Sequence, residues 1–286
     1  MKRILFFLIV LFISLSLPAQ DFFREDFDKS NNYLLLANPT VNNLKTINYL
    51  INNRILKINT GKVKFVGIYH KDQNYDFNKT IRFIKDNDMI NYYLHEFRCA
   101  VDKERLFEYN ACSGELKSLF DQSDGAFFFF VPYIPPDIYG EENTRSVITD
   151  PERHYFELTF LFHLLGGYQN ESFEPFLKKN PRYFITGFCL GLQTINVATG
   201  GTLIQDIPAE LFGADTPGAI VKTGRPDLHR NYWQFISEDT LLMGINLHPV
   251  HFTGNPFFGE KVKVSRSLQP LVYSSHHQAI DKLGKG

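Results

Sequence analysis

Four consecutive phenylalanines, Phe127 to Phe130, constrain the fold of this chain more than any other feature of its sequence. A strand with one face in water alternates apolar and polar side chains, but this run has only apolar side chains for both faces. Such a run suits a central parallel strand that helices cover on both sides. We expect this strand to span Gly125 to Val131.

Segments with strand and helix character alternate along the chain. Further strands are expected at residues 62–69 and 182–186, with a strand or strand flank at 90–97, and helices at 77–84, 116–121, 151–165 and 190–198. Asp150 as N-cap, Pro151 in the first turn and Gly166-Gly167 at the end mark the third helix. The alternation predicts an α/β fold with a doubly wound, mostly parallel sheet flanked by helices.

The chain reads as one domain. Its 286 residues are 44% hydrophobic, which suffices for one large core, and no internal repeat or low-complexity linker divides it. We expect the domain to span residues 62–286 and the polar, Asn-rich residues 21–61 to be an N-terminal leader that wraps it. Beyond the last expected helix, residues 244–252 resemble an alternating edge strand, and residues 271–280 a strand that runs into a polar turn.

The first 20 residues have the composition of a secretory signal peptide. A positive start at Lys2-Arg3 precedes an apolar run, Ile4 to Leu17, and Pro18-Ala19-Gln20 gives a small-residue exit. The run is shorter than the roughly 20 residues of a spanning helix, although an uncleaved anchor is the alternative. We therefore expect a periplasmic or extracellular protein with no stable membrane span after cleavage. The formal net charge of −1 gives no indication of nucleic-acid binding.

Cys189 lies at a strand-to-helix junction, between the apolar residues 182–186 and the helix expected after it. Gly187 and Gly191 stand two positions to either side, and they allow strand and helix to approach closely. A sulfur at the N-terminus of a helix is favoured as a thiolate, so Cys189 is a candidate nucleophile. The alternative is a buried structural cysteine.

The other two cysteines, Cys99 and Cys112, leave two possibilities open. In an oxidising compartment they could pair and leave Cys189 as the free thiol. They could equally be buried and unpaired.

Three stretches together resemble one family. They are Gly187-Phe188-Cys189-Leu190-Gly191-Leu192-Gln193 with Gly200 to Asp206, then Ser274-Ser275-His276-His277-Gln278-Ala279-Ile280, and Pro136 to Glu142 with Asp150, Arg153 and Glu157 downstream. In this order they resemble the class I glutamine amidotransferase-like hydrolases, specifically the γ-glutamyl-γ-aminobutyrate hydrolase branch. The resemblance implies a flavodoxin-like three-layer sandwich.

The same resemblance implies a cofactor-independent amidase that cleaves γ-glutamyl amides or peptides through a thioester on Cys189. The backbone N–H of Leu190 would hold the oxyanion, with a second donor at Val131. Gln193, His277 and Gln278 would shape the substrate pocket.

Three departures from the family pattern favour an alternative, a degenerate pseudo-enzyme that binds a small amide ligand. Phe130-Val131 stands where the family has Gly-Gly, and a β-branched residue does not easily take a glycine-like conformation. The family's His-Pro-Glu base segment would follow the paired histidines; either the sequence is a fragment or the triad is incomplete, and His248-Pro249-Val250 is not a substitute. Leu190 replaces a basic residue, which leaves its N–H but removes a side-chain contact.

Two further expectations concern charged and metal-binding residues. Arg153 and Glu157 lie four apart on one helix, where a surface ion pair is at least as reasonable as a functional role. The nine histidines show no ligand spacing with carboxylates or thiols, so no metal site is expected.

Overall fold

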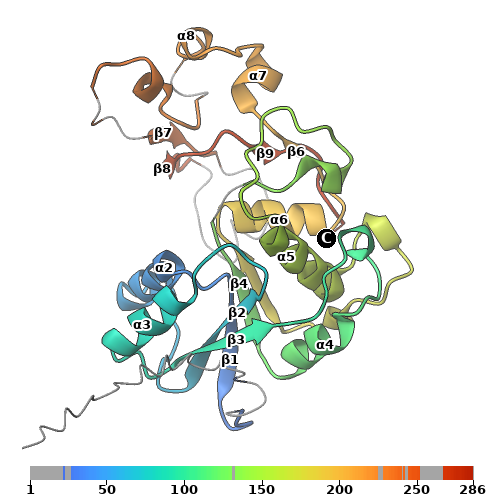
Figure 1. The fold of residues 1–286 in the computed structure, drawn as a ribbon. Helices are drawn as coiled ribbons and strands as arrows, with labels where there is room; N and C mark the ends of the chain where they lie inside the picture. Colours follow the sequence, from blue (N-terminus) through green and yellow to red (C-terminus); the bar gives the residue numbers. More distant parts are fainter. Residues whose placement is uncertain are drawn as a thin grey trace, which may run out of the picture.

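The protein is known from a computed structural model of residues 1–286 (Figure 1). The structure describes residues 22, 27–130, 133–224, 228–239, 241, 244–251 and 267–285. A five-stranded parallel sheet lies at its centre, in the order β3-β2-β1-β4-β5. Its strands are β1 (Asn32–Ala37), β2 (Val63–His70), β3 (Tyr92–Phe97), β4 (Gly125–Phe128) and β5 (Phe184–Gly187).

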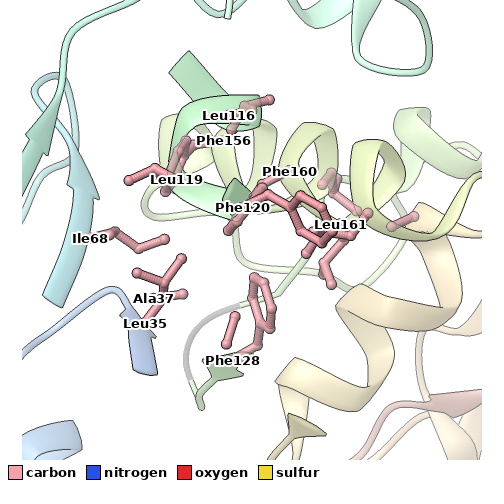
Figure 2. Packing of buried hydrophobic residues seen from close by; sticks show 14 of the residues in the cluster. Leu35, Ala37, Ile68, Leu116, Leu119, Phe120, Phe128, Phe156, Phe160 and Leu161 are labelled. Carbon is pink, nitrogen blue, oxygen red and sulfur yellow. The ribbon is translucent and has the colours of Figure 1, made fainter. Parts of the chain in front are cut away.

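Helices cover both faces of this sheet, as the phenylalanine run predicts. On one face lie α2 (Val41–Asn52) and α3 (Asn78–Asp86), and on the other α4 (Ser113–Asp121), α5 (Pro151–Leu165) and α6 (Leu190–Ala198) (Figure 1). Phe127 and Phe129 pack on the α2 side, whereas Phe128 packs on the opposite side near Phe160 of α5 (Figure 2). The doubly wound α/β prediction is confirmed.

The domain begins earlier in the chain than the sequence predicts. β1 is the central strand of the sheet, paired with β2 on one side and β4 on the other, and α2 follows it. Residues 32–52 are therefore part of the domain, and the expected boundary at residue 62 is wrong. The short buried run Leu34-Leu35-Leu36-Ala37 was obscured by the polar residues that flank it.

Helix α5 begins and ends where its sequence predicts. The Asp150 carboxylate accepts a hydrogen bond from the Arg153 N–H at 3.3 Å, Pro151 occupies the first turn, and Gly166 leaves the helix with a φ of 72°. The helix is buried around nearly its whole circumference, because it packs against the sheet, α4 and α6.

The described residues after α6 form small elements and add no strand to the central sheet. Residues 246–249 pair with residues 271–274, so the edge strand expected at 244–252 belongs to a separate two-stranded sheet. Residue 252 lies outside the described part. The remaining elements are β6 (Leu203–Ile204), α7 (Ile207–Phe212), α8 (Pro217–Ile220), β7 (Asn246–Pro249), β8 (Leu271–Ser274), β9 (Ala279–Ile280), and 3₁₀ turns at Lys103–Arg105, Pro136–Tyr139, Tyr168–Asn170, Phe176–Lys178 and Tyr232–Phe235.

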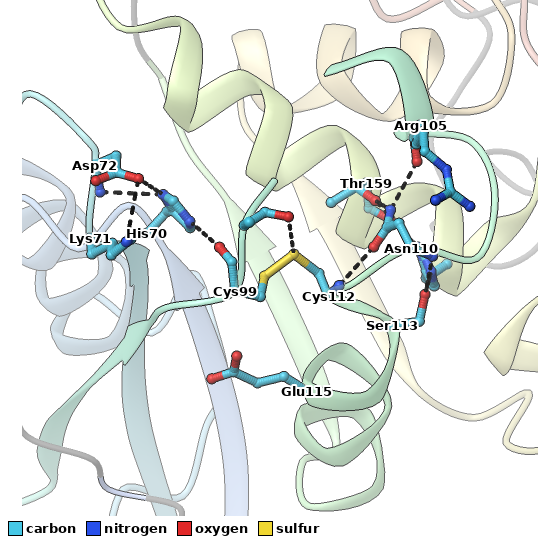
Figure 3. Close-up of a disulfide and its surroundings, with 12 residues drawn as sticks. His70, Lys71, Asp72, Cys99, Arg105, Asn110, Cys112, Ser113, Glu115 and Thr159 are labelled. Atoms are coloured by element: carbon cyan, nitrogen blue, oxygen red, sulfur yellow. Dashed lines mark hydrogen bonds and ion pairs between the residues drawn. A yellow bond between two sulfur atoms is a disulfide. The ribbon is translucent and has the colours of Figure 1, made fainter. Parts of the chain in front are cut away.

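Cys99 and Cys112 form a disulfide that joins the segment after β3 to the start of α4 (Figure 3). Their Cα atoms are 5.2 Å apart, which is the usual separation for a disulfide. Of the two possibilities that the sequence leaves open, pairing is the one observed, and Cys189 is the free cysteine.

The expected signal peptide, residues 1–20, lies outside the described residues. Within the described ranges, no helix has the length and apolar character needed to cross a bilayer.

Candidate active site

Cys189 lies with Phe188 in the two-residue junction between the end of β5 at Gly187 and the start of α6 at Leu190. Its backbone has φ 53° and ψ −110°, a conformation that L-residues rarely adopt, and its side chain is exposed. Strain of this kind persists only where the surrounding structure fixes the backbone, and it is a feature of nucleophile turns. The strand-to-helix turn predicted from the sequence is therefore present.

The two flanking glycines are required by close backbone contacts. A Cβ on Gly187 would overlap the carbonyl carbon of Gly191, and a Cβ on Gly191 would overlap the carbonyl oxygen of Phe128. The Phe188 N–H also donates to that Phe128 oxygen, at 2.9 Å. The turn is thus fixed against the end of β4. The contact between Gly187 and Gly191 is the close approach of strand and helix that their spacing predicts.

The surroundings of Cys189 disfavour its thiolate form. Desolvation by the surrounding protein raises the pKa of the thiol although its side chain is exposed, and the nearby Leu190 N–H opposes that rise. Among the described residues, no histidine hydrogen bonds to the sulfur. The backbone N–H of Leu190 hydrogen bonds to the Cys189 sulfur.

The end of β4 is held by a buried arginine. Arg153 Nη2 donates to the Phe129 carbonyl at 3.1 Å, Nη1 donates to the Phe130 carbonyl at 3.4 Å, and Nε donates to Glu157 Oε1 at 2.7 Å. Both side chains are fully buried, so the expectation of a surface ion pair is wrong. Burial raises the pKa of Glu157, and Arg153 opposes the rise. Val131, the proposed second oxyanion donor, lies outside the described residues.

The three residues expected to shape the pocket lie together. Gln193 Nε2 on α6 donates to the Gln278 carbonyl at 3.3 Å, and Gln278 Nε2 donates to Ser146 Oγ at 2.8 Å. His277 Nδ1 lies 2.9 Å from the Asp206 carboxylate. Burial alone would raise the pKa of Asp206, but the hydrogen bonds from His277 and from the Ala209 N–H lower it.

The family profile of peptidase C26 matches residues 109–286, more than half of the chain and including every stretch named above. The chain belongs to the peptidase C26 family. This family is of the class I glutamine amidotransferase-like type, and its members are cysteine-dependent amide hydrolases. Among curated proteins, no sequence matches the chain.

In this C26 fold, Tyr133 lies close to both His277 and Cys189, a proximity that the sequence does not predict. Its ring is perpendicular to the His277 imidazole, with centroids 4.7 Å apart. Burial raises the pKa of the Tyr133 hydroxyl, Arg230 opposes this, and the charges of Asp206 and Cys189 add to it. Tyr133 therefore lies within electrostatic reach of both Cys189 and the His277–Asp206 pair. Tyr133 follows directly after residues 131–132, and no spacing pattern in the sequence predicts that it lies at this site.

A second feature of the C26 domain was also missed. His229, His248 and His276, from three separate segments, each place a ring nitrogen within 4.8 Å of the others, a group that could hold a metal ion. The sequence expectation of no metal-binding constellation overlooked this group, because the ligand spacing arises from folding rather than from proximity in the chain.

Proposed function

We propose that this protein hydrolyses γ-glutamyl amide bonds through Cys189. The observation that carries the proposal is the strained turn at Cys189, on a C26 domain at the carboxyl edge of a parallel sheet, where open α/β folds bind their ligands. The γ-glutamyl specificity rests on the resemblance of residues 187–193 and 274–280 to that branch of the family.

The reaction has two halves. A base takes the thiol proton, and the Cys189 sulfur attacks the amide carbonyl carbon to form a tetrahedral oxyanion next to the Leu190 N–H. Collapse breaks the C–N bond, the amine leaves with a proton, and a thioester remains. Water then attacks the thioester carbon, the C–S bond breaks, and a γ-carboxylate and the free thiol are released. No step requires a metal or an organic cofactor.

The substrate in this proposal is a small γ-glutamyl amide or peptide. Its acyl part would lie against the wall that Gln193, His277 and Gln278 form, since these residues are joined to one another and to Asp206 and Ser146. A wall that is already hydrogen bonded loses little conformational entropy when a ligand binds.

The test is release of glutamate or amine from a panel of γ-glutamyl amides, with α-linked glutamyl amides as the specificity control. Wild-type protein is expected to release product from the γ-linked compounds only, and Cys189→Ala to release none. The matched control is Cys99→Ala/Cys112→Ala, which removes the other two cysteines and should remain active as long as it is folded. Equal rates for wild type and Cys189→Ala would refute the proposal.

One observation favours a second candidate, a ligand-binding protein without turnover. Burial raises the pKa of the Cys189 thiol, and this disfavours the thiolate that nucleophilic attack requires. In that case the same γ-glutamyl amides would raise the melting temperature of wild type and Cys189→Ala equally, while neither protein released product.

We further propose that the protein is exported. The disulfide between Cys99 and Cys112 supports this, since disulfides persist in oxidising compartments, and so does the apolar composition of residues 4–17. Expression of the full chain in a bacterial host should yield a periplasmic or secreted protein whose N-terminus begins near residue 21. A cytoplasmic protein that retains Met1 would contradict this.

A further inference from the structure

Three histidines converge outside the cysteine site. The rings of His229 and His248 have centroids 4.2 Å apart, those of His229 and His276 are 4.8 Å apart, and one nitrogen from each lies within 4.8 Å of the other two. All three side chains are half-buried, so water and ions can reach them. We infer that His229, His248 and His276 form a binding site for a divalent transition-metal ion such as Zn²⁺.

The backbone around the three residues is cross-linked. The His229 carbonyl accepts a hydrogen bond from the His276 N–H at 3.0 Å and another from Ser274 Oγ at 2.8 Å. His248 lies on β7, opposite Val272 of β8. The antiparallel β7–β8 pair and these two bonds therefore hold the three histidines in place before any ion binds, which lowers the entropic cost of binding.

Hydrogen bonds to two of the rings fix which ring nitrogen carries the proton. His276 Nδ1 lies 2.8 Å from the Gln278 carbonyl oxygen, and His248 Nδ1 lies 3.3 Å from the Pro249 carbonyl oxygen. A carbonyl only accepts, so each Nδ1 carries the proton and each Nε2 keeps its lone pair. Metal-binding histidines are oriented in this manner, with the second nitrogen donating to a carbonyl or carboxylate.

The spacing fits an ion after a small adjustment. Zn–N bonds of 2.0–2.1 Å in a tetrahedral site put the nitrogens about 3.4 Å apart. The three nitrogens lie within 4.8 Å of one another, and rotations of the rings can shorten these distances to the value that the ion requires. Three imidazoles without a carboxylate or thiolate suit Zn²⁺, Cu²⁺ or Ni²⁺ rather than Ca²⁺ or Mg²⁺. The fourth position would be left to water.

This site is distinct from the cysteine site but adjacent to its wall. His276 is followed directly by His277, which binds Asp206, and by Gln278, which binds Ser146. An ion on His276 would fix the start of this turn. The inference does not depend on the proposed hydrolysis, because it rests only on the three imidazoles and their supports.

The test uses untagged full-length protein, stripped with chelator and desalted, and titrates it with Zn²⁺ by calorimetry. One ion per chain is expected to bind with a Kd below about 1 µM, and to raise the melting temperature as expected for a ligand that binds only the folded state. His248→Gln and His276→Gln should each weaken binding by more than about 100-fold, since loss of even an outer-shell partner weakens binding by 10–100-fold. The control is His251→Gln, which removes an exposed histidine from the segment after β7.

Substitution with Co²⁺ provides a readout that needs no variant. Weak visible bands without a thiolate charge-transfer band are expected for a site made of imidazole nitrogens. A strong thiolate band would place the ion on Cys189 and overturn the inference. So would the absence of one-to-one Zn²⁺ binding by wild type, or an equal loss of affinity in His251→Gln.

Discussion

The guanidinium of Arg153 donates a 3.1 Å hydrogen bond to the carbonyl oxygen of Phe129, within a core that excludes both residues from water. Its Nε is bound to Glu157 at the same time. One buried cation thus holds both a neighbouring carboxylate and the backbone where β4 ends. The residues that follow this point are those from which a second oxyanion donor is expected.

Replacing Arg153 by methionine should destabilise the fold strongly. Arg153→Met leaves the Glu157 carboxylate buried without a counter-charge and frees the two carbonyls of Phe129 and Phe130, so we expect a loss of about 3–5 kcal/mol in the free energy of unfolding. Urea denaturation measures this. The control is Arg153→Met/Glu157→Gln, which removes both charges and should recover part of the loss. A double variant no more stable than Arg153→Met would contradict the pairing.

The loss of unfolding free energy in Arg153→Met should be smaller at low pH. Burial raises the pKa of Glu157, and removal of Arg153 removes the group that opposes the rise. A carboxyl whose folded pKa is above its unfolded value contributes stability that is complete below the unfolded pKa and lost as pH rises through the folded pKa. Denaturation from about pH 8 to about pH 5 should therefore narrow the gap between variant and wild type. Arg153→Met/Glu157→Gln, which lacks the carboxyl, should show no such narrowing.

Gly191, the second glycine of the turn around Cys189, allows the close packing of this turn to be tested. Gly191→Ala would push a methyl group into the Phe128 carbonyl oxygen, and such overpacking typically destabilises by about 1–3 kcal/mol. Gly114→Ala in α4 is the matched control, because a Cβ there meets nothing within 4 Å, and it should stabilise by about 0.4–1 kcal/mol. Thermal denaturation of both variants and of wild type measures these changes in stability. Equal effects would mean that the turn has room to relax.

Features that depend on local spacing were predicted well. The four phenylalanines predicted the buried strand. Asp150 and Pro151 predicted the start of α5, and Gly187 and Gly191 predicted the turn around Cys189. Each of these signals is contained within a few residues, and the physical constraint acts over the same short distance.

Features that depend on long-range contacts were not predicted. The i, i+4 spacing of Arg153 and Glu157 puts both on one face of α5, but it does not say that this face is buried against the end of β4. The histidine cluster joins residues 229, 248 and 276, and only the pairing of β7 with β8 and the backbone bonds to residue 229 bring them together. β1 was missed because strand pairing, not its own short apolar run, makes it central.

The disulfide should account for a substantial part of the stability. Cys99 and Cys112 are 13 positions apart in the sequence, and closing a loop of this size in the unfolded chain is worth about 3 kcal/mol. Cys99→Ala/Cys112→Ala is expected to lose about this amount, and reduction of wild type with a mild thiol reductant should lower its stability similarly. Cys189→Ala under the same reductant serves as the control, and it should respond as wild type does. A reductant effect on the variant without Cys99 and Cys112 would show that another group is responsible.

The strained backbone of Cys189 predicts that its two simplest replacements differ in stability. With φ 53° and ψ −110°, the position suits glycine and strains any residue with a Cβ, at a typical cost of about 1–3 kcal/mol. Cys189→Gly should therefore be more stable than Cys189→Ala by about 1 kcal/mol or more in thermal or urea unfolding, and neither should release product from a γ-glutamyl amide. The control pair is Ser113→Gly and Ser113→Ala at the start of α4, where the order should reverse because the backbone is helical. An alanine variant as stable as the glycine variant at position 189 would mean that the turn relaxes once the sulfur is gone, and that the strain belongs to the cysteine rather than to the backbone around it.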